Sequence, residues 1–179
     1  MKLNQAVFLD RDGVINRPIV IDGKPHPPRT VAEFEVLPGV AQACADLKTA
    51  GYFLVVVTNQ PDVGRGTLKK EAVEAVHEVM VQQLPIDRVE VCYHAGAKFG
   101  EPCECRKPQP GMLIRAAAAL DINLSRSFMV GDRWRDIDCG KRAHCKTIFI
   151  DRGYKEELRE QPDFRANSLV KAVRWILQT

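Results

Sequence analysis

Short apolar segments alternate with helical patterns along most of the chain, and this alternation restricts the possible folds more than any other feature of the sequence. Strands are expected at 6–9, 52–57, 89–93, 127–130 and 147–150, the last of these being the final strand. Helices are expected at 38–51, 67–84, 110–120 and 167–177. Strands that alternate with helices predict an α/β fold, in which a parallel sheet is covered by helices on both faces.

The stretches between these elements are too short to form a second domain. Residues 17–30 contain four prolines, and residues 96–110 lack a periodic pattern, so both stretches are expected to be irregular. A chain of 179 residues fits one domain with a single core. We therefore expect one domain that spans residues 1–179.

The composition is that of an ordinary globular protein, with 45% apolar and 27% charged residues. The formal net charge is +3, and no strip of aromatic and basic residues indicates binding to nucleic acid. No apolar run is long enough to span a bilayer, and the first residues lack the pattern of a signal peptide. These features predict a cytoplasmic protein without a membrane partner, and we expect a monomer.

Polar residues that can carry chemistry follow three of the expected strands directly. Asp10 follows the first strand, Thr58 follows the second, and Asp132 follows the strand at 127–130. In an open α/β sheet, ligands bind beyond the carboxyl ends of the strands. A single aspartate after a strand is most often a loop residue or a helix cap. Three such strand ends from distant parts of the chain predict a shared site.

Four short motifs extend this set of strand ends. They are Asp10-Arg11-Asp12-Gly13, Thr58-Asn59, Arg106-Lys107-Pro108, and Gly131-Asp132 followed by Asp136. In this order they resemble the four motifs of the haloacid dehalogenase (HAD) superfamily of phosphatases. The resemblance implies an enzyme that transfers a phosphoryl group from a small metabolite to Asp10 and then to water, with magnesium as its cofactor.

The chemistry of phosphate transfer gives the three aspartates separate roles. A magnesium ion held by Asp10 and Asp132 would neutralise part of their charge, so that Asp10 can approach an anionic phosphate and attack it. Asp12 would protonate the leaving oxygen and then take a proton from the attacking water. The family resemblance adds the backbone carbonyl of Asp12 as a further metal ligand.

The other motif residues would support this reaction. Lys107 and the hydroxyl group of Thr58 would stabilise charge on the transferring phosphoryl group. Gly13 would allow the loop after the first strand to turn close to the phosphate. Asp136 is expected either to bind the metal or to orient a ligand through water, and the sequence leaves both possibilities open.

Three cysteines and one histidine form a second candidate site, made of Cys92, His94, Cys103 and Cys105. Thiolates and imidazole are the ligands that tetrahedral zinc prefers. Because side chains would fill all four positions, the zinc is expected to be structural. The alternatives are disulfides, which are disfavoured in the cytoplasm, and a chance grouping, which is disfavoured because so many cysteines and histidines lie this close together. Since Cys105 directly precedes Arg106 and Lys107, a zinc-bound loop would fix the directions of both cations.

The remaining cysteines and one histidine have less specific expectations. Cys44, Cys139 and Cys145 are expected to be buried and to behave as small apolar residues. His77 lies beside the apolar stripe of the helix expected at 67–84. The sequence shows no partner for this imidazole, so we expect it at the edge of the packed face.

The run from Cys103 to Met112, together with Cys92-Tyr93-His94, narrows the resemblance to one subfamily. It is similar to the zinc-loop phosphatases that act on histidinol phosphate or on heptose bisphosphate. This subfamily implies a Rossmann-like sheet with a minimal cap, and the removal of the 7-phosphate of D-glycero-D-manno-heptose 1,7-bisphosphate. It also implies substrate-binding roles for Asn59, Gln60, Arg106 and Arg133.

Two segments depart from the subfamily pattern. The residues after Gln60 read Pro61-Asp62-Val63-Gly64-Arg65-Gly66, and residues 18–27 lack the expected polar, aromatic loop. Arg133 also stands where lysine is usual, so a planar guanidinium group replaces a compact ammonium group. These differences lie where a second part of the substrate would be bound, so they affect the predicted substrate more than the predicted reaction.

Three alternatives to a heptose-bisphosphate phosphatase are therefore considered, and the third, a nucleic-acid phosphatase, is disfavoured because no strip of aromatic and basic residues is visible. Histidinol phosphate or another small phosphorylated sugar is the first, although Arg65, Arg106 and Arg133 favour a bisphosphate over the cationic histidinol compound. A zinc-loop binding module without catalysis is the second. Such a module would normally have lost Asp10 or Asp12, and both are present.

Overall fold

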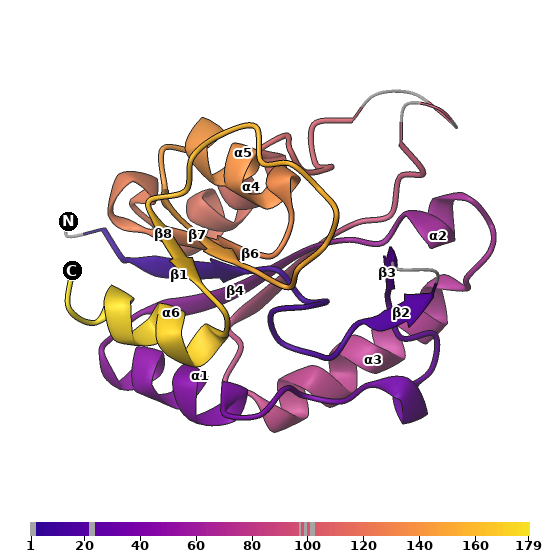
Figure 1. Cartoon of the computed structure of the whole chain (residues 1–179), viewed down its shortest axis with the longest axis horizontal. Helices are drawn as coiled ribbons and strands as arrows, with labels where there is room; N and C mark the ends of the chain where they lie inside the picture. Colours follow the sequence, from indigo (N-terminus) through magenta and orange to yellow (C-terminus); the bar gives the residue numbers. More distant parts are fainter. Residues whose placement is uncertain (1–2, 22–23, 97, 99, 101–102) are drawn as a thin grey trace.

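A six-stranded sheet forms the centre of the computed structural model, which describes residues 3–21, 24–96, 98, 100 and 103–179. Its strand order is β5-β4-β1-β6-β7-β8, and every neighbouring pair is parallel (Figure 1). The strands are β1 (Ala6–Leu9), β4 (Phe53–Asn59), β5 (Arg88–Cys92), β6 (Phe128–Gly131), β7 (Lys146–Ile150) and β8 (Phe164–Ala166). The predicted parallel sheet is therefore confirmed.

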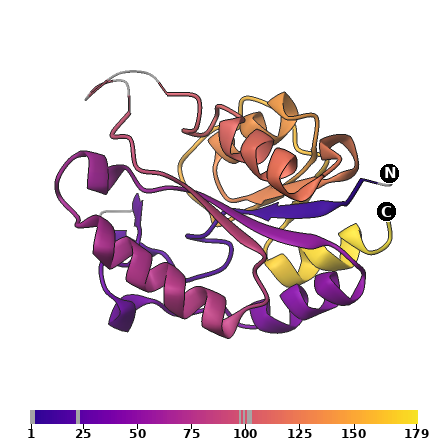
Figure 2. The same ribbon diagram turned by 180° about the vertical axis from the view of Figure 1, so that it is seen from behind.

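Helices cover both faces of this sheet, as predicted (Figures 1 and 2). One face carries α1 (Val40–Thr49), α3 (Lys70–Gln83) and α6 (Leu169–Ile176), and the other carries α4 (Gly111–Leu120) and α5 (Trp134–Arg142). Because alternate side chains of a strand point to opposite faces, β1 contributes to two separate cores. Leu9 packs in the first core with Leu47 of α1, and Phe8 packs in the second with Leu113 of α4.

The predicted strand at 147–150 is not the final one, because β8 pairs with β7 at the edge of the sheet. Only three residues long, with Arg165 in the middle, β8 has no apolar pattern from which it could be predicted. The helix α5 was also missed. Its sequence is mostly polar, yet Asp136 and Asp138 are buried within it.

The stretch at 17–30, expected to be irregular, contains a two-stranded hairpin of β2 (Ile19–Ile21) and β3 (Lys24–His26). The hairpin lies at the same end of the molecule as the short helix α2 (Pro61–Gly64) (Figures 1 and 2). Two 3-10 turns, Val31–Glu33 and Leu124–Arg126, complete the described elements. Residues 22–23 and parts of 97–102, which belong to the two stretches expected to be irregular, lie outside the described residues.

The predictions for three cysteines are confirmed, because Cys44, Cys139 and Cys145 are all buried. Each packs in one of the two apolar cores. In the described part of the chain, no helix combines the length and apolarity that are needed to cross a bilayer.

Candidate active site

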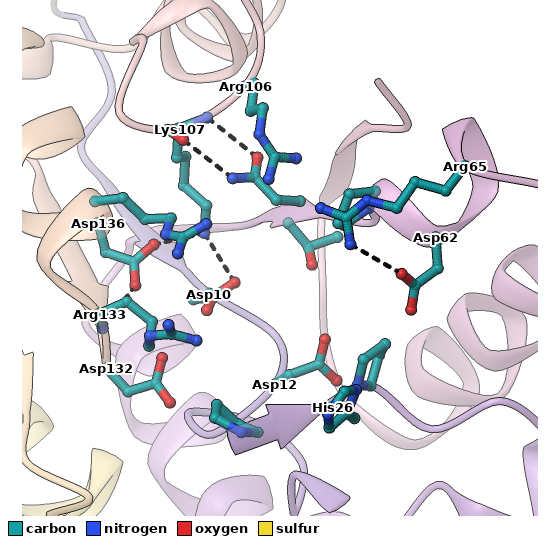
Figure 3. A pocket seen from close by; sticks show the side chains of 16 residues that line it. Asp10, Asp12, His26, Asp62, Arg65, Arg106, Lys107, Asp132, Arg133 and Asp136 are labelled. Carbon is teal, nitrogen blue, oxygen red and sulfur yellow. Dashed lines mark hydrogen bonds and ion pairs between the residues drawn. The ribbon is translucent and has the colours of Figure 1, made fainter. Parts of the chain in front are cut away.

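The carboxyl ends of β1 and β6 lie next to each other and bring the predicted aspartates into one pocket (Figure 3). Asp10 follows β1, Asp132 follows β6, and Asp136 lies in the first turn of α5. Together with Lys107 they form what we call the buried centre. The pocket has a volume of about 280 Å³, and Thr58 at the end of β4 also lines it.

Lys107 is the cation of the buried centre. Its Nζ atom lies 2.8 Å from Asp10 Oδ1 and 2.6 Å from Asp136 Oδ1, and it donates a hydrogen bond to the carbonyl oxygen of Val57 at 2.8 Å. Burial favours the neutral amine, but the charges of Asp10 and Asp136 outweigh this effect and raise the pKa of Lys107. The lysine therefore stays charged and fixes the Asp10 carboxylate at the end of its strand.

Burial also acts on the aspartates of the buried centre. It raises the pKa of Asp10 to about 6, an effect that Lys107 opposes and Asp136 adds to. Burial raises the pKa of Asp132 as well, and the negative charges of Asp10 and Asp136 raise it further. Three carboxylates next to a single lysine thus leave unbalanced negative charge, which a bound cation would relieve.

The donor atoms of the buried centre fit a hard metal ion. Carboxylate oxygens of Asp10, Asp132 and Asp136 all lie within 4.8 Å of one another. Asp132 Oδ1 is buried and accepts no hydrogen bond from the described residues. Oxygen ligands of this kind are those that Mg²⁺ prefers.

Asp136 has both carboxylate oxygens engaged within the protein. Oδ1 pairs with Lys107, and Oδ2 accepts a hydrogen bond from the backbone N–H of Arg133 at 3.0 Å. The carboxylate thus caps the start of α5 and holds the lysine at the same time.

Gly13 allows the loop after β1 to approach Asp132. Its φ angle is +90°, a conformation that side-chain-bearing residues rarely adopt. A Cβ atom at this position would clash with Asp132 Oδ2, so any larger residue would displace the carboxylate. The sequence predicted close approach to the phosphate at this glycine, and the structure places it against Asp132.

Asp12 also lines the pocket, and three side chains hold its carboxylate. Arg11 donates to both oxygens at 3.0–3.2 Å, Asn16 Nδ2 donates to Oδ1 at 3.0 Å, and Gln60 Nε2 donates to Oδ2 at 3.0 Å. Gln60 also donates to the Thr58 hydroxyl at 2.9 Å. The structure therefore places Gln60 behind two pocket residues, not in the pocket lining where a substrate contact was expected.

Asn59 lines the pocket as well, and its amide clamps the backbone of Lys107. Its Nδ2 atom donates to the Lys107 carbonyl at 3.1 Å, and its Oδ1 atom accepts from the Lys107 N–H at 3.1 Å. The expected role of Asn59 was substrate binding. The geometry adds the support of the lysine, a contact between residues 48 positions apart that sequence spacing does not reveal.

Four arginines line the pocket, and we call Arg65, Arg106, Arg133 and Arg135 the arginine rim. The first three are labelled in Figure 3. Arg106 Nη1 donates to the carbonyl oxygen of His94 at 3.1 Å. Burial lowers the pKa of Arg106, and the nearby charges of Arg135 and Arg65 lower it further. Several guanidinium groups are therefore close enough to repel one another, which favours an anionic ligand between them.

Two carboxylates partly balance the arginine rim. Asp62 pairs with Arg65 at 3.4 Å, so the unusual aspartate after Pro61 faces the pocket with a cation beside it. Glu156 accepts from Arg133 Nε at 2.6 Å and from Nη2 at 2.8 Å. The same glutamate lies 3.9 Å from Arg135 Nη2.

Four residues in or beside the pocket had no predicted role in the site. Arg135 was not identified, although its position two residues after Arg133 is visible in the sequence. Glu156 and Tyr154 belong to the segment after β7, where no motif marked them. Tyr154 lies beside Asp132, and the Cζ atom of Arg133 lies over the Tyr154 ring, 5.7 Å from the ring centroid. His26 reaches the pocket from the unpredicted hairpin.

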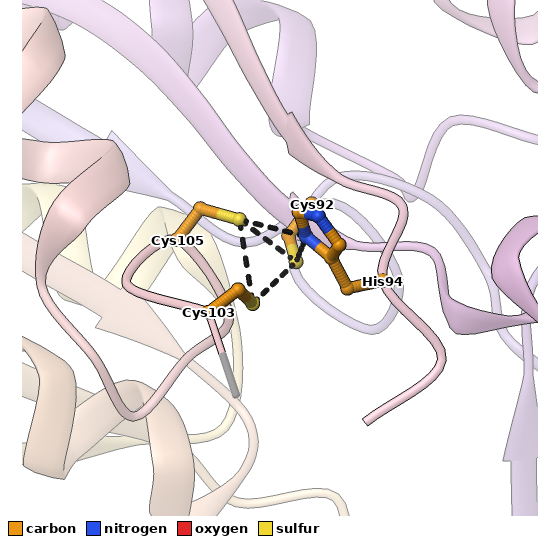
Figure 4. A group of neighbouring side chains, drawn as sticks. All are labelled: Cys92, His94, Cys103 and Cys105. Carbon is orange, nitrogen blue, oxygen red and sulfur yellow. Dashed lines mark hydrogen bonds between the residues drawn. The ribbon is translucent and has the colours of Figure 1, made fainter. Parts of the chain in front are cut away.

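The predicted zinc ligands converge at one point near the end of β5 (Figure 4). The sulfur atom of Cys105 lies 3.2 Å from that of Cys92 and 3.6 Å from that of Cys103, and His94 Nδ1 lies 3.2 Å from Cys105 Sγ. Tetrahedral zinc with Zn–S bonds of about 2.3 Å would separate its sulfur ligands by roughly 3.8 Å. The distances are much longer than a disulfide of about 2.05 Å, and all three thiols are free.

Comparison with known proteins agrees with this geometry. Residues 104–174 match the model of the HAD-hydrolase-like family. The D-glycero-beta-D-manno-heptose-1,7-bisphosphate 7-phosphatase of Yersinia pestis is 37% identical over 176 residues, which cover 92% of this chain and 90% of the relative. The D-glycero-D-manno-heptose-1,7-bisphosphate 7-phosphatase of Thermosynechococcus vestitus is 35% identical over 191 residues, covering 96% of this chain and 94% of the relative.

A solved structure resembles the whole fold. The D,D-heptose 1,7-bisphosphate phosphatase from B. bronchiseptica, complexed with magnesium and phosphate, superposes with a TM-score of 0.78 and 30% identity, covering 97% of this chain and 98% of that one. Because similarity at this level extends over nearly the full length of both proteins, the chain belongs to the HAD-like hydrolases, in the family of the heptose-1,7-bisphosphate 7-phosphatases.

Proposed function

We propose that this chain removes the 7-phosphate of D-glycero-D-manno-heptose 1,7-bisphosphate by way of a phosphorylated Asp10. One observation carries the proposal: a buried centre of carboxylates and one lysine opens into a rim of four arginines. The relatives named above act on the same bisphosphate by name. We propose one domain over residues 1–179, working as a cytoplasmic monomer on this small phosphorylated sugar, without nucleic acid or membrane.

The reaction has two steps at phosphorus. In the first, a carboxylate oxygen of Asp10 forms a bond to phosphorus while the bond to the sugar oxygen breaks, and Asp12 gives that oxygen a proton. In the second, water attacks the phosphorus of the aspartyl-phosphate and gives a proton to Asp12. Phosphate leaves, and Asp10 returns to its carboxylate form. A pKa of about 6 leaves Asp10 mostly ionised, as a nucleophile must be, near neutral pH.

Lys107 and Thr58 stabilise the group that moves. The Nζ atom of Lys107 already lies against Asp10, and therefore beside the position that the phosphoryl group would occupy. Such a preorganised charge lowers the barrier because it needs no rearrangement during the reaction. Asn59 supports this position through the backbone of Lys107, and Asp136 supports it through the ammonium group.

Magnesium is the proposed cofactor of the buried centre. Asp10, Asp132 and the backbone carbonyl of Asp12 would hold it, while Asp136, whose oxygens are both engaged, would orient a ligand through water. When bound, the ion would neutralise carboxylate charge and polarise the phosphate oxygens. The unpartnered oxygen of Asp132 is the feature that supports this assignment among the described residues.

The arginine rim is the proposed site for the second phosphate of the substrate. Arg65, Arg106 and Arg133 present guanidinium groups, which can bind phosphate oxygens in pairs. Histidinol phosphate carries an ammonium group at its far end, which the rim would repel. The rim thus favours a bisphosphate, and another phosphorylated sugar is the second candidate.

Zinc bound by Cys92, His94, Cys103 and Cys105 is proposed as a structural element of this recognition. Arg106 follows Cys105 directly and donates to the carbonyl oxygen of His94, so one arginine is tied to the loop at two points. A bound zinc would hold both points in place. Removal of the zinc should then disturb Arg106 before it disturbs the buried centre.

The proposal can be tested by measuring phosphate release in the presence of magnesium. Both anomers of heptose 1,7-bisphosphate and histidinol phosphate would be compared, with Asp10→Asn as the blank. We expect one heptose anomer to exceed histidinol phosphate in kcat/KM by about 10²-fold or more, a difference of roughly 3 kcal/mol. Equal and slow turnover of all three compounds would refute the heptose substrate and leave the phosphatase mechanism in place.

A further inference from the structure

Arg11 is fully buried beside Asp12, and its guanidinium group contacts two different partners. On one side, Nε and Nη2 donate to the Asp12 carboxylate at 3.0–3.2 Å. On the other side, Nη1 lies 2.9 Å from Nε2 of His77. A buried arginine that joins a loop carboxylate to a distant helix is costly unless its donors are satisfied, so these contacts define its position.

His77 belongs to α3, 66 residues further along the chain, and only 8% of it is exposed. A guanidinium group can only donate hydrogen bonds, so His77 Nε2 must be the acceptor. The imidazole is therefore neutral, with its proton on Nδ1. This contact corrects the expectation that His77 has no partner at the edge of the packed face.

The backbone of Arg11 is held as firmly as its side chain. Its carbonyl oxygen accepts hydrogen bonds from the N–H groups of Ile15 at 2.8 Å and Asn16 at 3.1 Å. The turn after β1 therefore fixes where the side chain starts, and His77 fixes where it ends. Asn16 and Gln60 also contact the Asp12 carboxylate, but Arg11 is its only charged partner among the described residues.

We propose that Arg11 and His77 form a positioning pair that aims the Asp12 carboxylate at the leaving oxygen of the substrate. This inference rests on the proposed role of Asp12 as the proton donor. His77 holds one end of the guanidinium plane, and the plane holds both oxygens of Asp12. Without the imidazole acceptor, Arg11 can rotate and the carboxylate loses its fixed direction, although Asp12 itself is unchanged.

The choice of leaving group separates this role from a general effect on folding. A sugar alkoxide needs a proton as it leaves, whereas 4-nitrophenolate leaves without one. The value of kcat/KM reports the transfer of the phosphoryl group to Asp10, which is the step that uses the proton. A variant with a misdirected Asp12 should therefore lose kcat/KM on heptose 1,7-bisphosphate and keep it on 4-nitrophenyl phosphate.

The experiment compares His77→Leu, His77→Gln and Arg11→Lys with the wild-type enzyme on both substrates. We expect His77→Leu to lower kcat/KM on the sugar phosphate about 10-fold and on the aryl phosphate less than about 2-fold. His77→Gln offers a carbonyl oxygen to Arg11 and should restore most of the activity. Arg11→Lys keeps the charge but cannot contact both partners, so it should behave like His77→Leu, and it supplies the test if His77→Leu does not fold.

Two control variants make each outcome decisive. Met80→Ala leaves a cavity in the apolar core under the same helix, and should lower the melting temperature without changing the ratio between the substrates. Asp12→Asn should show the same dependence on leaving group as His77→Leu, but more strongly. If Asp12→Asn impairs both substrates equally, the proposed role of Asp12 fails, and the positioning pair with it. If Asp12→Asn behaves as expected while folded His77→Leu or Arg11→Lys keeps full activity on the sugar phosphate, the positioning pair alone is refuted.

Discussion

The buried centre and the arginine rim are charged regions of the same pocket, but they are built in different ways. In the buried centre, the side chains of Asp10, Lys107 and Asp136 are 1–12% exposed, and their ion pairs span 2.6–2.8 Å. In the rim, the paired side chains of Arg65 and Arg133 and their partners are 22–36% exposed, with pairs of 3.4 Å and 2.6 Å, so exposure and not pair length separates the two regions. Groups of the first kind are fixed before substrate arrives, while groups of the second can exchange their partner for a phosphate.

The difference indicates a division of labour within the pocket. Buried charges in fixed positions mainly stabilise the transition state, and so they affect kcat. Partly exposed charges bind the distant part of the substrate and so affect mainly KM. The boundary between the two regions is sharp, because Arg106 of the rim and Lys107 of the buried centre are adjacent in the chain.

The largest effect is expected when the nucleophile is removed from the buried centre. Asp10→Asn should lower kcat by about 10⁴-fold or more, because the amide cannot act as the attacking carboxylate. Steady-state phosphate release measures this loss. Asp46→Asn on the exposed side of α1 is the matched control and should keep full activity. Retention of more than about one hundredth of kcat in Asp10→Asn would assign the nucleophile to another residue.

Loss of the zinc ligands should affect the rim before the buried centre. Cys105→Ser is expected to reduce bound zinc from about one per chain to nearly none and to raise KM for the bisphosphate about 10-fold, as Arg106 loses its support. Zinc content by mass spectrometry and steady-state kinetics on the same samples test both parts. Cys139→Ser, outside the cluster, controls for the loss of a buried thiol. Full zinc content in Cys105→Ser would contradict the assignment of the cluster.

A smaller effect is expected for the rim arginine that the sequence did not reveal. The Nε atom of Arg135 is buried without a hydrogen-bond partner among the described residues, and the side chain lines the pocket. Arg135→Gln should raise KM for heptose 1,7-bisphosphate about 5-fold, roughly 1 kcal/mol, and leave KM for the 7-monophosphate nearly unchanged. Equal changes for both substrates would show that this arginine does not recognise the second phosphate.

The last effect concerns stability and not catalysis, and it distinguishes buried groups from the rim once more. Burial lowers the pKa of His77 to about 4, and the charge of Arg11 lowers it further, whereas the ordinary value is 6.5. The unfolded chain therefore binds a proton below about pH 6.5 that the folded chain does not, so this contribution to stability is complete above that pH and is lost as the pH falls towards 4. The rim arginines stay charged over the whole range.

Chemical denaturation at about pH 7 and pH 4.5 tests this difference. The free energy of unfolding of the wild-type protein should fall by about 2 kcal/mol more than that of His77→Gln, which has no group that titrates there. An identical fall in both proteins would show that His77 is protonated in the folded state.

The buried centre was largely predictable from the sequence, because local patterns define it. Each of its aspartates follows a short apolar strand or lies within the next helical turn, and parallel strands bring their carboxyl ends to one edge. The cluster of Cys92, His94, Cys103 and Cys105 was equally visible from the types and spacing of its residues. In both cases a few neighbouring residues carry the information.

Three of the four rim arginines were predicted from the sequence, but the ion-pair partners of the rim and the supports of the buried centre were not. Glu156 meets Arg133 across 23 residues, and His77 meets Arg11 across 66. Such pairs depend on where loops and helices pack, and no periodicity in the sequence encodes them. The hairpin that carries His26 was missed because each of its strands has only three residues and because β3 contains a proline.

The neighbouring residues Arg106 and Lys107 provide the most direct test of the division between recognition and chemistry. We would measure kcat and KM for Arg106→Met and Lys107→Met with heptose 1,7-bisphosphate. Lys107→Met should lower kcat about 10³-fold with KM within about 3-fold, and Arg106→Met should raise KM about 10-fold with kcat within about 3-fold. If both substitutions change the same parameter to the same extent, the two regions do not have separate roles.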